Sequence, residues 1–268
     1  MMKYNQGRLR FKQSLPFLRV KGTVNLFFLL SCFALPAQNT IAVRFTTPTG
    51  FERVEVEPTS FASYLRQLPL QPKGALVKYY DGREKANRSV YAAVVNMDIG
   101  KKDLQQCADA VMRLRGEYLY GQKKYEKIHF ELVSTLKPSY YKDYAKGDYS
   151  YPTFRKYMEH IFMSANTASL LHELAKVPSF NLMRIGDVLV QKGVPYGHAV
   201  IVVDMATNPK TGQKVYLLAQ SYMPAQETQI LQNPNNEDIS PWYELKDETI
   251  TTPEWTFQPV NLKRFKDE

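Results

Sequence analysis

Apolar positions follow a helical period in the middle of the chain and run almost continuously in its last third. Between residues 103 and 118, positions three and four apart lie on one helix face: Leu104, Cys107, Ala108, Val111, Leu114 and Tyr118. Asp103, followed three residues later by Gln106, resembles a capping box, so we expect Asp103 to be the N-cap. Cys107 is then expected in the first turns of a helix whose apolar face looks inward.

Other segments carry shorter patterns of both kinds. Helices are expected at residues 60–67, 151–162 and 167–176, and a strand at 128–133 that turns His129 and Glu131 away from the core. Residues 140–151 are dense in Tyr and Lys and are expected to form a surface loop. Residues 75–80 and 90–97 are expected to be strands joined by a turn at Asp81 and Gly82.

The last third predicts an antiparallel sheet. Strands are expected at residues 187–191, 198–204 and 215–220, and turn residues at 208–212 join the last two. Three successive strands without a helix between them favour antiparallel pairing. Helices followed by strands predict an α+β domain over residues 75–268, and residues 38–74 are expected to form an N-terminal arm on it.

The start of the chain has the composition of an export signal. Six basic residues and no acidic residue precede position 38, and an apolar run of about 12 residues there ends at Leu35. This run is shorter than the ~20 residues that a membrane-spanning helix needs. Residues 1–37 are therefore expected to be a signal sequence, the mature chain to lack a transmembrane helix, and the protein to be exported to the periplasm or outer envelope. An alternative is a lipid anchor on Cys32.

Removal of this signal changes the charge balance. Of 35 basic residues six lie before residue 38, which leaves 29 against 26 acidic residues. The remaining basic residues are interspersed with acidic ones, whereas nucleic-acid binding needs a concentrated basic face. A nucleic-acid partner is excluded on these grounds.

The chain pairs a cysteine near a helix start with a histidine at a strand start. Cys107 would be the only thiol left after cleavage, so it is either an inert buried residue or a reactive one. A helix N-terminus and a nearby imidazole both favour the thiolate, and His198 follows Gly197 at the head of an apolar strand. Hairpin pairing would place Gln220 close to His198, where its amide could orient the imidazole. Asp204 and Ser221 are weaker alternatives for this third role.

Three blocks of sequence resemble papain-like cell-wall cysteine amidases and endopeptidases of the CHAP and NlpC types. They are QQCADAVMRL at 105–114, GDVLVQKGVPYGHAVIVVDM at 186–205 and VYLLAQSY at 215–222. The resemblance implies a papain-like fold in which helices pack on an antiparallel sheet. It also implies that Cys107 is the nucleophile, His198 the general base and Gln220 the residue that orients the imidazole. Segments such as DLQQCADAVMRLRGEYLY and LAQSYMPAQ also resemble an exported Bacteroidetes family of unknown function.

Two functions therefore stay open. One is a cysteine hydrolase of the cell envelope that cleaves an amide bond, with peptidoglycan peptides as the expected substrate and a helix N–H group stabilising the oxyanion. The other is a non-catalytic envelope protein that binds peptide or glycan on the same scaffold. No cofactor is expected, and no zinc-binding spacing of Cys and His is present in the sequence. His129, His160 and His172 are interpreted as ordinary polar residues.

Overall fold

The apolar runs of the last third form the centre of an antiparallel sheet. The computed structural model describes residues 39–268, so the expected signal sequence at 1–37 and the alternative anchor at Cys32 lie outside the described residues. The central strands are β6 (Val188–Gln191), β7 (His198–Thr207) and β8 (Lys214–Gln220). Nine of the ten residues in β7 are buried, because both faces of the sheet are covered. Full coverage explains why this strand reads as a continuous apolar run instead of an alternating one.

Nine strands make up the main sheet, and all of its ladders are antiparallel. Its order is β2-β9-β8-β7-β6-β13-β5, with β1 paired to β7 and β10 paired to β8. The outer members are β1 (Glu52–Arg53), β2 (Tyr91–Val94), β5 (Ala175–Lys176), β9 (Gln229–Leu231), β10 (Tyr243–Glu244) and β13 (Leu262–Arg264). Two small hairpins pair β3 (His129–Glu131) with β4 (Pro138–Tyr140), and β11 (Ile250–Thr251) with β12 (Thr256–Phe257).

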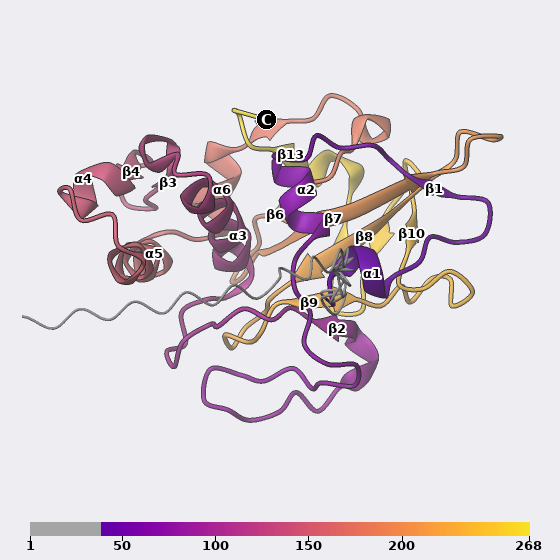
Figure 1. Cartoon of the computed structure of the whole chain (residues 1–268), viewed down its shortest axis with the longest axis horizontal. Helices are drawn as coiled ribbons and strands as arrows, with labels where there is room; N and C mark the ends of the chain where they lie inside the picture. Colours follow the sequence, from indigo (N-terminus) through magenta and orange to yellow (C-terminus); the bar gives the residue numbers. More distant parts are fainter. Residues whose placement is uncertain (1–38) are drawn as a thin grey trace, which may run out of the picture. The chain divides into compact units, whose positions relative to one another are not determined.

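Helices cover one face of the sheet and the ends of its central strands. They are α1 (Ile41–Arg44), α2 (Phe61–Arg66), α3 (Cys107–Gly121), α4 (Tyr141–Ala145), α5 (Tyr151–Ser164) and α6 (Thr167–Glu173). Short 3-10 turns lie at Arg88–Val90, Tyr125–Lys127, Phe180–Leu182 and Pro259–Asn261. Helices α2 and α3 pack against β7, and α3 to α6 gather with the β3–β4 hairpin beside the sheet (Figure 1).

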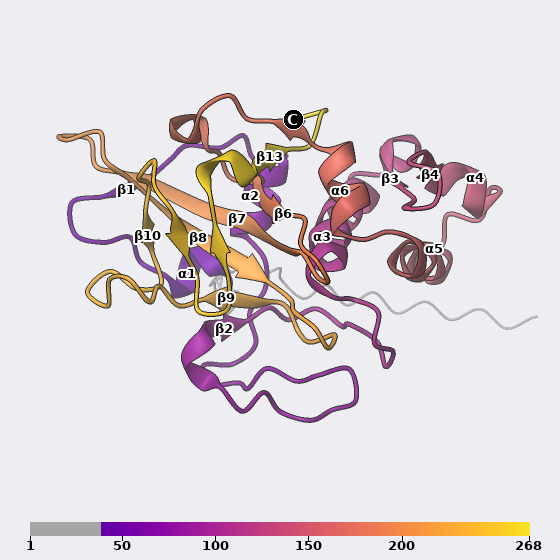
Figure 2. The same ribbon diagram turned by 180° about the vertical axis from the view of Figure 1, so that it is seen from behind.

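Two apolar clusters show how the sheet is buried on both sides. The larger one joins the helices to the sheet through buried residues such as Val111, Phe154, Ile201 and Leu217. The smaller one lies on the opposite face, where the chain around Phe180 and the β11–β12 hairpin cover Val200 and Leu218 (Figure 2). Successive residues of β7 therefore face opposite packed layers. The apolar surface buried on both sides offsets the conformational entropy lost when so long a strand becomes ordered.

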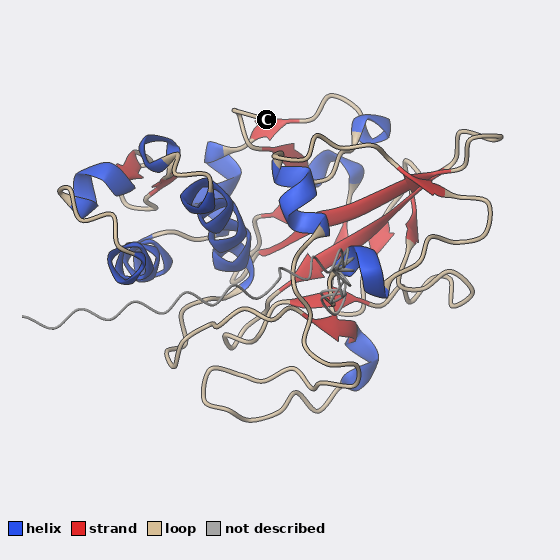
Figure 3. Cartoon of the chain, in the orientation of Figure 1, coloured by secondary structure: helices blue, strands red, loops and turns tan. Residues whose placement is uncertain are grey.

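The fold is α+β, with α3 to α6 grouped beside the antiparallel sheet and α2 packed on it (Figure 3). Strands β6, β7 and β8 confirm the antiparallel arrangement expected of the last third. The expected helices at 60–67 and 151–162 are confirmed as α2 and α5, and β3 confirms the strand expected at 128–133, with Phe130 buried and His129 and Glu131 only half-buried. The segment treated as an arm supplies Ile41, Phe61 and Leu65 to the core.

Four predictions of secondary structure are wrong, and in each case a tertiary contact determines the structure instead of the local sequence pattern. Residues 75–80 form no regular strand and do not pair with β2, which instead pairs with β9. Residues 140–151 contain α4, because Tyr141 is drawn fully into the core. Helix α6 ends at Glu173, and the residues expected to extend it to 176 pair with β13. Helix α3 begins at Cys107 and not after Asp103.

Within residues 39–268, no helix combines the length and the apolar character that crossing a membrane would require.

Candidate active site

Cys107 is the first residue of α3. The chain arrives in extended conformation at Gln106, and the Asp109 carboxylate accepts the Gln106 backbone N–H at 3.0 Å. Asp103, expected to be the cap, accepts instead from the backbone N–H of Ala225 at 2.7 Å and from the Gln106 amide. The tertiary bond to Ala225 removes Asp103 from the helix and moves the helix start to Cys107. The thiol is therefore closer to the helix N-terminus than the sequence pattern predicted.

His198 is the first residue of β7 and lies beside Gln220, the last residue of β8. Its Nε2 lies 2.8 Å from Gln220 Oε1, and both side chains are buried. The ladder between the two strands pairs Ile201 with Ala219, which places Gln220 level with Val200, two residues from His198 along β7. Residues two apart in a strand point to the same face, so the two side chains can meet. The structure therefore brings together His198 and Gln220 as the hairpin register predicted.

Cys107 and His198 lie on neighbouring elements but do not hydrogen-bond to each other. The Cys107 sulfur lies 4.0 Å from the carbonyl oxygen of Gly197, the residue directly before His198. Gly197 is required there, because a Cβ would lie 2.3 Å from the Gln191 carbonyl and 2.7 Å from Thr167 Oγ1. Close packing of this loop against α6 thus holds the head of β7 next to the start of α3.

Aromatic side chains surround the imidazole. The ring centroid of His198 lies 4.8 Å from that of Tyr222, 5.2 Å from that of Trp255 and 5.9 Å from that of Phe257. Trp255 is itself held by a 2.7 Å hydrogen bond from its indole N–H to Gln191. These contacts restrict rotation of the imidazole and keep water from its buried edge.

A cavity of about 280 Å³ opens at Cys107. Residues from the start of α3, the start of α6 and the loop before β7 line it, among them Cys107, Asp109, Thr167, Tyr196, Gly197 and Met223. Asp103 and Asp109 are its acidic lining residues, and no Lys, Arg or His of the described chain belongs to the lining. The thiol therefore borders a space that a small part of a substrate could enter.

Burial keeps both titratable groups neutral at pH 7. Burial, followed by the negative charge of Asp109, raises the pKa of Cys107 to about 11, although backbone N–H groups of Ala108 and Ala199 oppose this shift. Burial also lowers the pKa of His198 to about 4, against the opposing effect of its bond to Gln220. The expectation of a lowered thiol pKa at the helix start is wrong, because desolvation outweighs the helix dipole.

Asp109 is the charge next to this thiol, and its own pKa is raised by burial to about 8. Above that pH its carboxylate is ionised and opposes formation of a second negative charge on Cys107. Asp109→Asn removes the charge and keeps an acceptor for Gln106, so alkylation of Cys107 by iodoacetamide is expected to reach half its maximal rate at a lower pH. Asp143→Asn, on the exposed surface of α4, is the control and should leave the profile unchanged. An unchanged profile in Asp109→Asn would contradict this account.

The alternatives for the third residue lie elsewhere. The Asp204 carboxylate binds Arg53 and Arg66, each at 2.7 Å, and the Ser221 hydroxyl donates to the Gln226 carbonyl at 2.8 Å. Neither residue bonds to His198.

The other three histidines lie apart from the site. His129 and His172 contact acidic side chains of β3 and α6, and His160 stacks on Tyr144. Among residues 39–268, no group of three or more His, Cys, Asp or Glu side chains is placed to hold a metal ion.

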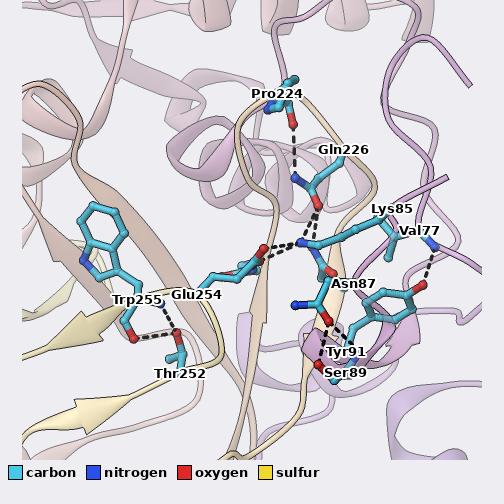
Figure 4. Close-up of polar contacts among 12 residues, drawn as sticks. Val77, Lys85, Asn87, Ser89, Tyr91, Pro224, Gln226, Thr252, Glu254 and Trp255 are labelled. Atoms are coloured by element: carbon cyan, nitrogen blue, oxygen red, sulfur yellow. Dashed lines mark hydrogen bonds and ion pairs between the residues drawn. The ribbon is translucent and has the colours of Figure 1, made fainter. Parts of the chain in front are cut away.

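Sequence reasoning missed the residues behind Gln220. The Gln220 Nε2 group donates to Glu254 at 2.6 Å, and Lys85 forms an ion pair with Glu254 at 2.7 Å (Figure 4). These residues come from segments 169 positions apart, and no spacing or motif connects them. The only local signal was the rare Trp255 beside Glu254, in a chain with two tryptophans.

Comparison with known proteins places the chain in a family but assigns no activity to it. Neither the curated proteins nor the solved structures contain a match to the chain. One family model, described as a domain of unknown function (4846), matches residues 41–264, a range that includes Cys107, His198 and Gln220. The chain therefore belongs to the family of domain of unknown function 4846.

Proposed function

We propose that this protein is a papain-like cysteine hydrolase of the bacterial cell envelope that cleaves an amide bond in peptidoglycan peptides. The observation that carries the proposal is the 2.8 Å bond between His198 Nε2 and Gln220 Oε1, with the Cys107 sulfur against Gly197 at the neighbouring helix start. In a cysteine hydrolase a third residue orients the imidazole in this way, and here the thiol lies beside the residue that precedes His198.

The location and the substrate class rest on separate arguments. The basic and apolar start of the chain supports export to the periplasm or outer envelope, where peptidoglycan is the abundant amide substrate. The cavity at Cys107 carries the carboxylate of Asp103, the carboxyl group of Asp109, which ionises only near pH 8, and no basic side chain of the described residues. This lining suits a peptide bearing amino groups better than an anionic substrate. The resemblance of the three sequence blocks to cell-wall amidases agrees with this choice.

The chemistry follows from the residues in place. His198 takes the thiol proton at Nδ1, because Nε2 is engaged by Gln220, and Cys107 Sγ attacks the substrate carbonyl carbon. A backbone N–H at the start of α3 stabilises the oxyanion, and His198 then passes the proton to the leaving amine as the C–N bond breaks. Water hydrolyses the thioester, which releases the acid and restores the thiol. For this transfer the thiol must turn from the Gly197 carbonyl oxygen toward the imidazole. Catalytic hydrogen bonds often become short only when the substrate binds.

A non-catalytic role in binding peptide or glycan is the second candidate. It is favoured by the pKa values, because burial raises that of Cys107 to about 11 and lowers that of His198 to about 4. Neither group is charged at neutral pH in the free protein, so no thiolate–imidazolium pair is ready before a ligand enters.

Incubation with purified peptidoglycan separates the two candidates. The purified protein is expected to release soluble muropeptide fragments, identified by mass spectrometry as products of a single type of amide cleavage. Cys107→Ala is the matched control and should release none. Binding of peptidoglycan in a sedimentation assay without any release by the wild-type protein would support the binding protein and contradict the hydrolase.

A further inference from the structure

A buried charge network lies behind the candidate active site, on the side of Gln220 away from His198. Lys85 is only 4% exposed, and its ammonium group contacts both oxygens of Glu254 at 2.7 Å and Gln226 Oε1 at 3.0 Å. Figure 4 shows Lys85 between Glu254 and Gln226, reaching toward both side chains. The ammonium group has three N–H donors and no acceptor, so each of these partners must present an oxygen to it.

The charge on Lys85 determines which way the neighbouring amides point. Gln226 Oε1 faces Lys85 and also accepts from Gln229 Nε2 at 3.0 Å. A carboxylate accepts hydrogen bonds and cannot donate them, so Glu254 Oε2 requires the amino end of the Gln220 side chain, which lies 2.6 Å away. The oxygen of the Gln220 amide is then left for the imidazole of His198.

We infer that Glu254, held by Lys85, is a positioning residue that sets the tautomer of His198 through Gln220. Because Gln220 offers an oxygen at 2.8 Å, His198 must carry its proton on Nε2. The other ring nitrogen, Nδ1, then has its lone pair free and makes no hydrogen bond within residues 39–268. Gln220 alone would not fix the Nε2-protonated tautomer of His198. If its side-chain amide were rotated by 180°, it would present its amino group to Nε2 and favour a proton on Nδ1.

The inference rests on the proposed hydrolase function for its catalytic consequence, but the tautomer can be observed without activity. A cysteine hydrolase needs an unprotonated nitrogen toward the thiol, and the wrong tautomer of a catalytic histidine removes its action as a base. Glu254 itself does not line the cavity at Cys107, so it acts through Gln220 and not on the substrate.

The test uses Glu254→Gln, which keeps the size of the side chain and adds a donor. Gln220 can then adopt either orientation. The protein, labelled with ¹⁵N-histidine, is studied by long-range ¹H–¹⁵N NMR near neutral pH, and the His198 signals are assigned by their loss in His198→Ala. Wild-type His198 is expected to be protonated on Nε2 only. In Glu254→Gln, protonation on Nδ1 should appear, and fragment release should fall about 10- to 100-fold, the range known for loss of the partner that orients a metal-bound imidazole.

Glu227→Gln is the matched control, because Glu227 also accepts from a glutamine amide at 2.7 Å, that of Gln71, and makes no bond to this network. Its His198 signals and activity should match those of wild type. The unchanged signals of the other three histidines report that each variant is folded. A wild-type proton on Nδ1, or an Nε2 tautomer unaltered in folded Glu254→Gln, would overturn the inference even if peptidoglycan is cleaved. A shift of tautomer in a protein that cleaves no peptidoglycan would support the positioning role and reject the hydrolase.

Discussion

Cys107→Ser is expected to reduce release of peptidoglycan fragments by about a thousandfold or more, because the hydroxyl lacks the nucleophilicity of the thiol. His198→Ala should cause a loss of similar size, since the thiol proton then has no acceptor. The double variant should be no worse than either single variant, because residues that act as one unit have non-additive effects on rate. The measurement is the initial rate of fragment release at a fixed concentration of peptidoglycan.

Alkylation of Cys107 tests whether the pair already forms without a substrate. Because neither group is charged at neutral pH in the free protein, His198→Ala and Gln220→Ala should leave the alkylation profile of Cys107 close to that of wild type. Replacement of His129 or His172 is the control, because both contact β3 and α6 and neither lines the cavity at Cys107. Activity that survives Cys107→Ser would show that Cys107 is not the nucleophile, and a shift of the alkylation profile to higher pH in His198→Ala would show that the pair already forms in the free protein.

Asp204→Ala should lower the free energy of unfolding by about 3–5 kcal/mol, the range for removing one partner of a buried ion pair. The Asp204 side chain is fully buried and accepts from Arg53 Nε and Arg66 Nε, both at 2.7 Å. It therefore ties β7 to the strand β1 and to the helix α2. Its loss leaves the guanidinium of Arg66, whose side chain is only 10% exposed, without a counter-charge.

Urea denaturation followed by circular dichroism would measure this change. Asp81→Ala is the matched control, because Asp81 pairs with Arg83 at the same 2.7 Å distance on the surface, where the Arg83 side chain is 70% exposed. Solvent screens that pair, so the midpoint of unfolding should stay near that of wild type. A loss below about 1 kcal/mol in Asp204→Ala would mean that water or relaxation replaces the lost carboxylate.

Part of the candidate site could be predicted from the sequence, because the two strands of a hairpin are neighbours along the chain. The turn residues at 208–212 and the two apolar runs on either side determine the pairing of β7 with β8, and pairing determines which side chains meet. Gln220 could therefore be placed beside His198 from the sequence, and the 2.8 Å bond confirms it. Placement of Cys107 at a helix start followed from helical spacing, although the first residue of the helix did not.

The sequence by itself determined the periodic elements, their α+β class and the meeting of His198 with Gln220, because these depend on residues close together in the chain. Only the tertiary structure decided that Asp103 leaves α3 for Ala225, and that Lys85 and Glu254 stand behind Gln220. It also decided that the pKa of Cys107 rises to about 11 instead of falling. Burial and charge at a point sum over segments that fold together from distant positions, so no local pattern contains them.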